Sequence, residues 1–300
     1  MTHPPGSSTR LDHVVIIAST RRPGLLGRTV EALLEQTVPA DLVVLSVAGT
    51  EDVPAGLAAR DGVRVVVSER GSTVQRNTGL RSIDPVPDLV TYLDDDILLA
   101  PDYFERLRDV MRREPDVVLL TGLVVVDGAA LGRELSPEEA RAAISAAPES
   151  SLLKDIGGTY GCNMTTRGHV ALREPFDERM RLYAWQEDTD FAVRCHAHGR
   201  VVHYWGCVAA HLAVGSGRVN GRALGFAQIV NPFHMWRKGT KSAGNMVHDW
   251  WRYLGSNTLR LGDRSRPDRS GRLVGNLLGF REVAFRGGRP EAVEKVAASR

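Results

Sequence analysis

The sequence Leu89-Val90-Thr91-Tyr92-Leu93-Asp94-Asp95-Asp96-Ile97 ends an apolar, β-prone run in three consecutive carboxylates. Alternate side chains of a strand point to the same side, so Asp94 and Asp96 would face the same way if the strand continued. Adjacent carboxylates repel one another and are stabilised when a cation lies between them. Oxygen ligands of this kind suit Mg²⁺ or Mn²⁺. The segment therefore predicts a divalent-metal site at a strand end, with a solvated acidic turn as the simpler alternative.

Strand and helix patterns alternate around this segment. A continuous apolar run predicts a buried strand at 14–18, and further strands are predicted at 42–47, 63–67 and 89–93. Helices are predicted from Pro23, from Ser72, where Ser72 and Gln75 fit a capping box, and over 103–113. This order is typical of an α/β protein with a mostly parallel sheet and right-handed crossovers. The chain has neither a Gly-x-Gly-x-x-Gly after the first strand nor a Walker lysine motif, which disfavours dinucleotide and P-loop folds.

The second half of the chain is organised differently. The alanine- and glutamate-rich segment 128–148 predicts an exposed insertion with a helix from Pro137, and 157–161 is a glycine-rich loop. A helix is expected from Glu187 or Asp188 to Gly199, followed by short strands at 201–204 and 208–210. Helical periodicity returns from residue 231. The predicted units are a disordered tail (1–10), an α/β domain (11–230, with halves at about 11–126 and 150–230) and a basic helical extension (231–300).

Composition indicates a soluble globular protein, because 43% of the 300 residues are apolar and 25% are charged. The net charge of +2 is unevenly distributed. Residues 237–300 contain 14 Lys/Arg and 6 Asp/Glu, a balance of +8, so the rest of the chain carries −6. The basic part could face anionic lipid or a polyanionic acceptor. No zinc-finger or RNA-binding signature is present, so nucleic acid is not an expected partner.

Cysteine usage and hydropathy bear on the location of the protein. The three cysteines form no Cys-x-x-Cys pair and are odd in number, which favours a reducing, cytoplasmic setting. The longest apolar stretch, 117–126, is too short to cross a bilayer, and the first ten residues contain no signal core. An alternative use of the cysteines is structural zinc, since Cys and His cluster between Cys195 and His211, although without finger spacing.

Five motifs occur in a characteristic order along residues 12–215: Ala18-Ser19-Thr20-Arg21, Gln75-Arg76-Asn77-Thr78-Gly79, Tyr92-Leu93-Asp94-Asp95-Asp96, Gly161-Cys162-Asn163-Met164, and Glu187-Asp188-Thr189-Asp190-Phe191 followed by Arg194 and Gly199. In this order they resemble the family-2 glycosyltransferases, which have the GT-A fold. The resemblance implies transfer of a sugar from a nucleoside-diphosphate sugar to an acceptor hydroxyl, with inversion and with Mn²⁺ or Mg²⁺ as cofactor. In such a reaction the cation neutralises the charge of the leaving diphosphate.

The resemblance also assigns residues to the donor side of the site. Asp96 would bind the metal, Asp94 would bind the metal through water or the ribose, and Asp95 would support them. His211 would be a further metal ligand, unless it is only a structural histidine. The remaining nucleotide-sugar contacts implied by the resemblance are Ser19, Thr20, Arg21, Asp52 and Arg76. At Asp52 the sequence departs from the common Asn-x-Ser-x-Asp pattern, which also leaves the neighbouring Glu51 without a clear role.

On the acceptor side, Asp188 resembles the catalytic base of the family, and Glu187 would orient it or contact the acceptor. A helix N-terminus lowers the pKa of a carboxylate, so burial would have to offset that effect at Asp188. The alternative is an ordinary pair of acids in the first turn of a helix. Trp185 and Asn163 are expected to contact the acceptor, which could be a growing cell-surface glycan, a lipid-linked sugar or a small molecule.

The C-terminal extension predicts a location. Met246, Trp250 and Leu254 recur every four residues beside Val247 and Trp251, which indicates an amphipathic helix with basic surroundings. We expect reversible binding to the inner face of an anionic membrane. The alternative is that the tryptophans pack on the catalytic domain or across a homodimer.

Two other functions remain open at this point. One is a catalytically silent nucleotide-sugar-binding scaffold of the same fold. The other is a nucleotidyltransferase, which is disfavoured because no glycine-rich basic loop follows the first strand.

Overall fold

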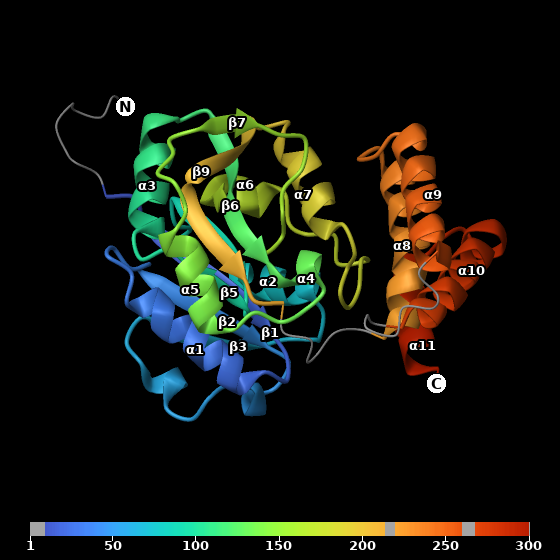
Figure 1. Ribbon diagram of the computed structural model, residues 1–300, viewed down its shortest axis with the longest axis horizontal. Helices are drawn as coiled ribbons and strands as arrows, with labels where there is room; N and C mark the ends of the chain where they lie inside the picture. Colours follow the sequence, from blue (N-terminus) through green and yellow to red (C-terminus); the bar gives the residue numbers. More distant parts are fainter. Residues whose placement is uncertain (1–9, 214–219, 260–267, 300) are drawn as a thin grey trace.

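The computed structural model describes residues 10–213, 220–259 and 268–299 (Figure 1). One mixed sheet forms the centre of the α/β domain, with strand order β3-β2-β1-β4-β8-β6-β9-β5 and with β7 paired to β9. The strands are β1 (His13–Ser19), β2 (Leu42–Val47), β3 (Val63–Val67), β4 (Leu89–Asp94), β5 (Ile97–Leu99), β6 (Val117–Asp127), β7 (Leu153–Asp155), β8 (Asn163–Arg167) and β9 (Arg200–His211). The predicted N-terminal tail lies, except for Arg10, outside the described residues.

The N-terminal half of the sheet is parallel, as predicted. Strands β3, β2, β1 and β4 pair in parallel, and the register sets Ala18 beside Asp94 and Ser19 beside Val47. The carboxyl ends of β1, β2 and β4 therefore meet at one edge, which is where ligands bind in open α/β sheets. The second half is mixed: β8 runs antiparallel to β4 and β6, whereas β6 and β9 are parallel.

Side chains of the central strands alternate between two apolar layers. On β1, Val15 and Ile17 pack on one side of the sheet and Val14 and Ile16 on the other, and all four are buried. Burial on both faces explains why this strand reads as a continuous apolar run. The helices of this domain are α1 (Pro23–Leu34), α2 (Ser72–Arg81), α3 (Tyr103–Arg113), α4 (Gly128–Leu131), α5 (Pro137–Ser145), α6 (Gly168–Arg173) and α7 (Glu187–Cys195), with 3-10 turns at Thr50–Asp52 and Leu57–Ala59.

Some predicted details of these elements were wrong. Helix α2 is capped by Gly71, whose N–H donates to Gln75 Oε1 at 3.1 Å, so Ser72 does not form the predicted capping box. The two short strands expected after Gly199 form one strand, β9, whose register against β6 shifts between Tyr204 and Val208. The helix expected from Pro137 is present, and Ser136 and Glu139 form a capping box at its start.

In the described residues, the C-terminal part contains the helices α8 (Gly221–Lys238), α9 (Ala243–Leu259), α10 (Arg269–Arg286) and α11 (Val293–Ala298). It begins before the predicted boundary at residue 231, and α8 continues through Pro232. Helices α8 and α10 cross closely, since a Cβ added at Gly225 or Gly275 would lie 2.0 Å from a backbone oxygen of the other helix. In Figure 1 these helices stand beside the end of the α/β domain that carries α7.

Two further features bear on the predicted setting. Within the described residues, no helix is both long enough and apolar enough to cross a bilayer. The three cysteines are free thiols with buried side chains.

Candidate active site

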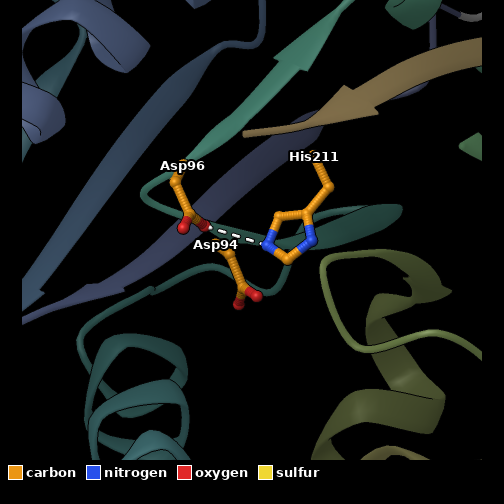
Figure 2. Close-up of side chains that lie close together, drawn as sticks. All are labelled: Asp94, Asp96 and His211. Atoms are coloured by element: carbon orange, nitrogen blue, oxygen red, sulfur yellow. Dashed lines mark ion pairs between the residues drawn. The ribbon is translucent and has the colours of Figure 1, made fainter. Parts of the chain in front are cut away.

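Three predicted metal ligands come together at the edge of the sheet. Asp94, Asp96 and His211 each contribute one ligand atom, and these atoms all lie within 4.8 Å of one another. Figure 2 shows the two carboxylates beside the imidazole, with His211 Nε2 3.2 Å from Asp96 Oδ1. Asp96 and His211 are buried, whereas 39% of the Asp94 side chain is exposed. Two carboxylates and an imidazole form a donor set that suits a divalent cation and leaves coordination positions for phosphate oxygens.

Strand pairing explains why residues so far apart in sequence meet here. Asp94 ends β4, and Asp96 lies in the turn before β5. β5 pairs antiparallel with β9 so that Ile97 faces His211, and the N–H of Leu212 donates to the carbonyl of Asp96 at 2.9 Å. The turn after the acidic segment is therefore fixed against the end of β9.

His211 is held from behind by two residues that the sequence analysis did not assign. Its Nδ1 donates to Asp127 Oδ1 at 2.9 Å, and the Tyr160 hydroxyl donates to Asp127 Oδ2 at the same distance. Burial lowers the pKa of His211, but the hydrogen bonds that its ring donates to Asp127 and Asp96 outweigh this effect and raise the pKa to about 10. The protonated ring carries a proton on Nε2, and a metal ion held by His211 would replace that proton. Asp127 would keep the ring oriented.

The middle carboxylate of the acidic segment turns away from the cluster. Asp95 accepts hydrogen bonds from Ser19 Oγ at 2.6 Å and from Arg22 Nη1 at 2.8 Å, and its carbonyl accepts from Thr29 Oγ1 at 2.7 Å. Burial raises its pKa to about 6 even though Arg22 and Ser19 act in the opposite direction. Asp95 thus joins the end of β4 to the end of β1 and the segment after it.

The predicted donor-side residues surround the ends of β1 and β2. The backbone N–H of Arg21 donates to Asp52 Oδ1 at 2.7 Å, and Asp52 is 3% exposed. Gln75 Nε2 donates to the carbonyls of Ser19 and Ser46, both at 2.8 Å, while Thr20 Oγ1 lies 3.4 Å from Gln75 Oε1. Gln75 therefore ties two strand ends to the first turn of α2.

Arg76 connects the acidic cluster with the acids of α7. Its Nη2 donates to Asp94 Oδ1 at 3.1 Å and to the carbonyl of Gly161 at 3.0 Å, and its Nη1 donates to Glu187 Oε1 at 2.9 Å. The side chain is 3% exposed. The sequence analysis expected Arg76 to contact the donor. In this structure its guanidinium is engaged by carboxylates from both halves of the site.

The two acids at the start of α7 have distinct surroundings. Asp188 Oδ2 accepts from the N–H of Gly161 at 2.9 Å, and Oδ1 accepts from the N–H of Thr189 at 2.7 Å. Burial raises the pKa of Asp188 although these hydrogen bonds lower it. Burial and the charge of Asp188 raise the pKa of Glu187 to about 8, with Arg76 opposing the shift. Burial thus offsets the helix terminus, as the assignment of a base requires.

The turn that precedes α7 is strained and is held by the C-terminal helices. Leu182, Ala184 and Gln186 have φ values of 60°, 49° and 69°, a region that few residues other than glycine adopt. The hydroxyl of Tyr253 on α9 accepts from Gln186 Nε2 at 2.8 Å and from Trp185 Nε1 at 3.0 Å. Further contacts to this turn come from Asn231 on α8, which donates to the carbonyl of Trp185, and from Asp249 on α9, which accepts from Gln186.

The two predicted acceptor contacts have different positions. Trp185 lies in the strained turn next to the α7 acids, partly buried against Tyr253 and stacked with Tyr183. Asn163 is completely buried at the start of β8, and its amide bonds to Thr121 at 2.8 Å and to the carbonyl of Gly122 at 3.2 Å. Its side chain joins β8 to β6 and is not available to an acceptor in this structure, so that assignment needs correction.

The predicted zinc alternative finds no support in the described part of the chain. There, the only group of three or more His, Cys, Asp or Glu residues with suitably close ligand atoms is Asp94, Asp96 and His211. The sequence analysis missed Arg22, Gln75, Asp127 and Tyr160 as parts of the site. Asp127 carried a usable signal, because it ends an apolar strand in the same way as Asp94 does.

Comparison with known proteins agrees with this geometry. Residues 12–216 match the family described as Glycosyltransferase like family 2, and the chain belongs to this family. It is 30% identical over 168 residues to the glucosyl-dolichyl phosphate glucuronosyltransferase of Haloferax volcanii. That match covers 53% of each protein, so the chain spans about half the length of this curated relative.

Two solved structures share the fold. GalNAc-T7, determined with UDP, GalNAc and Mn²⁺, aligns with a TM-score of 0.55 at 15% identity, over 70% of this chain and 45% of that one. The mannosyltransferase PcManGT from Pyrobaculum calidifontis, in complex with GDP-Man and Mn²⁺, aligns with a TM-score of 0.52 at 15% identity, over 97% of this chain and 87% of that one. The predicted GT-A fold is therefore confirmed, and the second alignment extends over the C-terminal helices.

Proposed function

We propose that this protein transfers a sugar from a nucleoside-diphosphate sugar to an acceptor hydroxyl, with inversion and with Mn²⁺ or Mg²⁺ as cofactor. The observation that carries the proposal is Arg76, which joins Asp94 of the three-ligand cluster to Glu187 beside Asp188. A cation-binding cluster and a buried pair of acids are thereby held in one site. Family membership supports the same reaction class.

The residues divide the work between the two substrates. Asp94, Asp96 and His211 would hold the cation, which when bound neutralises the charge of the leaving diphosphate. Arg76 neutralises part of the negative charge between the cluster and α7. On the acceptor side, Asp188 would take the proton of the attacking hydroxyl, while the N–H groups of Gly161 and Thr189 fix its orientation. Glu187 would position the acceptor or Asp188.

For the acceptor, we propose a lipid-linked sugar or a growing cell-surface glycan. The curated relative is named for transfer to a glucosyl-dolichyl phosphate, which supports a lipid-linked substrate. The stacked pair Tyr183 and Trp185, next to the α7 acids, offers aromatic faces of the kind on which a sugar ring packs.

A panel of UDP- and GDP-sugars with Mn²⁺ tests the proposal, with donor hydrolysis and transfer as readouts. Asp96→Ala should abolish Mn²⁺-dependent binding of the nucleoside diphosphate. Asp188→Asn should leave that binding unchanged but reduce transfer by at least ~10²-fold, the usual scale for a lost general base. Glu138→Gln is the control, because Glu138 is an exposed acid in the first turn of α5. Metal-dependent nucleotide binding without any turnover would instead indicate the silent scaffold.

A further inference from the structure

Helices α9 and α10 pack against each other in antiparallel directions. Trp250 of α9 contacts the ring of Phe280 at a centroid distance of 5.1 Å, and Asn257 Nδ2 donates to Asn276 Oδ1 at 2.9 Å. Residue numbers rise along α9 as they fall along α10, which fixes the direction of the pair. Trp250 also donates to the carbonyl of Ile229, so this tryptophan packs against the neighbouring helices α8 and α10.

Both helices also carry apolar side chains that are exposed. On α9, Val247 and Trp251 are 41% and 74% exposed. On α10, Val274, Leu277 and Phe285 are 43%, 63% and 81% exposed. We call these five residues the apolar face. A group of exposed apolar side chains on neighbouring helices often marks a docking surface.

Helix geometry places the exposed apolar residues of α9 and α10 on the same side of the helix pair. One residue along an α-helix corresponds to a rotation of about 100°. Trp251 follows Trp250, and Leu277 follows Asn276, so each of these two exposed residues lies one such step beyond a contact position. Because the helices are antiparallel, an equal rotation from the contact position turns Trp251 and Leu277 toward the same side of the pair. Gly275, one residue before Asn276, packs on α8, so the apolar face points away from α8.

The charge around the apolar face is positive. The acids within α9 and α10 are Asp249 and Glu282, which are 7% and 4% exposed and form ion pairs with Lys241 and Arg289. The exposed charged residues of the two helices are Arg252, Arg281 and Arg286. A symmetric contact between two copies of this face would bring like charges together, whereas an anionic lipid surface complements both the charge and the apolar stripe.

We propose that the apolar face docks onto the surface of an anionic lipid bilayer, with Trp251, Leu277 and Phe285 entering the interface and Arg281 contacting the headgroups. The opposite side of α9 carries Asp249 and Tyr253, which hold the turn before α7. One helix therefore links the lipid-facing surface to the acids of the active site. Binding to lipid needs no sugar transfer, so this inference can be tested apart from the proposed function.

Flotation of the full chain with vesicles tests the inference. The protein should bind vesicles of phosphatidylglycerol and phosphatidylcholine at low salt, bind pure phosphatidylcholine at least ~10-fold more weakly, and lose affinity as salt screens the arginines. The triple variant Trp251→Ser, Leu277→Ser, Phe285→Ser should bind at least ~10-fold more weakly. Its control is Leu172→Ser, because Leu172 is 50% exposed on α6 of the α/β domain. Arg281→Gln should weaken binding, whereas Arg112→Gln on α3 should not.

A second readout locates the contact. Tryptophan emission should shift to shorter wavelength when vesicles are added, and Trp251→Phe should retain binding but lose most of that shift. Retained secondary structure and nucleotide binding verify that each variant is folded. The inference is overturned if the wild-type protein ignores anionic vesicles at low salt, or if the triple variant binds them as the wild type does. A wild-type dimer that the triple variant converts to a monomer, without vesicle binding, would assign the face to a second copy of the chain.

Discussion

Arg76 and Glu187 form a buried ion pair, with Nη1 and Oε1 2.9 Å apart and side-chain exposures of 3% and 12%. The pair joins α2 of the nucleotide-binding half to α7 of the acceptor half. Since the second amino group of Arg76 contacts Asp94 at 3.1 Å, one guanidinium connects the cation-binding cluster to the acids of α7. Removal of this guanidinium leaves the largely buried Glu187 and the partly exposed Asp94 without their cationic partner.

We therefore expect Arg76→Ala to lower the free energy of unfolding by about 3–5 kcal/mol, the usual cost of an uncompensated buried charge. Arg81→Ala is the matched control, because Arg81 lies on the same helix and pairs with Glu178 while 59% exposed. That variant should lose at most about 1 kcal/mol. Urea unfolding in EDTA measures both. Equal losses in the two variants would show that the bridge from Arg76 does not stabilise the fold.

Asp127 should determine how well His211 binds the metal. Asp127→Ala removes the acceptor of His211 Nδ1, and loss of such a group typically weakens metal affinity by about 10–100-fold. Titration with Mn²⁺ in the presence of a nucleoside diphosphate measures this affinity directly. Asp116→Ala is the control, since Asp116 precedes the other end of β6 and is 58% exposed. Unchanged Mn²⁺ affinity in Asp127→Ala would mean that His211 is not a ligand.

The sequence was sufficient to predict where the parallel strands end, and this located most of the site. Apolar runs that stop at polar residues marked Ser19 and Asp94, and the pairing of β1 with β2 and β4 then placed both at one edge. The meeting of Asp96 with His211 depends on the pairing of β5 with β9, which a short apolar run cannot specify. The resemblance supplied His211 where strand patterns alone could not.

The sequence was least informative where the direction of a side chain, and not its residue type, decides what it contacts. Trp250 and Trp251 are adjacent and identical, yet a rotation of about 100° places one in the helical interior and the other in solvent. Asn163 begins an antiparallel strand, so its side chain enters the sheet interior and not the substrate edge. Arg76 has a long side chain whose partners come from three separate segments. Such contacts depend on tertiary packing, which local patterns do not determine.

Tyr253 should influence catalysis from outside the site. Tyr253→Phe keeps the ring but removes the hydroxyl that accepts from Trp185 and Gln186, so the strained turn before α7 loses two restraints. Because small displacements of catalytic groups are costly, we expect kcat to fall by roughly 10-fold or more, with the nucleotide affinity and the donor KM unchanged. Trp251→Phe, on the opposite side of the same helix, should leave kcat, the nucleotide affinity and the donor KM unchanged in the absence of lipid. A fall in nucleotide affinity instead would indicate general unfolding of the site.

His13 should make the folded state sensitive to acid. It is completely buried in β1, with Nε2 2.7 Å from Thr91 Oγ1 and its ring against Phe104. Burial, assisted by the charge of Arg108, lowers its pKa from 6.5 to about 3. Between these values the unfolded chain binds a proton that the folded protein excludes. The stability contributed by the neutral imidazole is therefore present above pH 6.5 and is lost as the pH falls toward 3.

A change of His13 to a residue that does not titrate should reduce this dependence. His13→Gln retains a donor that can reach Thr91, so its fold should persist while the slope of unfolding free energy against pH decreases. The slope of the unfolding free energy against pH should differ between wild type and variant by up to about 1.4 kcal/mol per pH unit below about pH 6. Above about pH 7.5 the two slopes should be equal. Urea unfolding at several pH values, in EDTA, measures both slopes, and comparison of the two proteins cancels the contributions of the other histidines. Parallel slopes would mean that His13 takes up its proton in the folded protein as readily as in the unfolded chain.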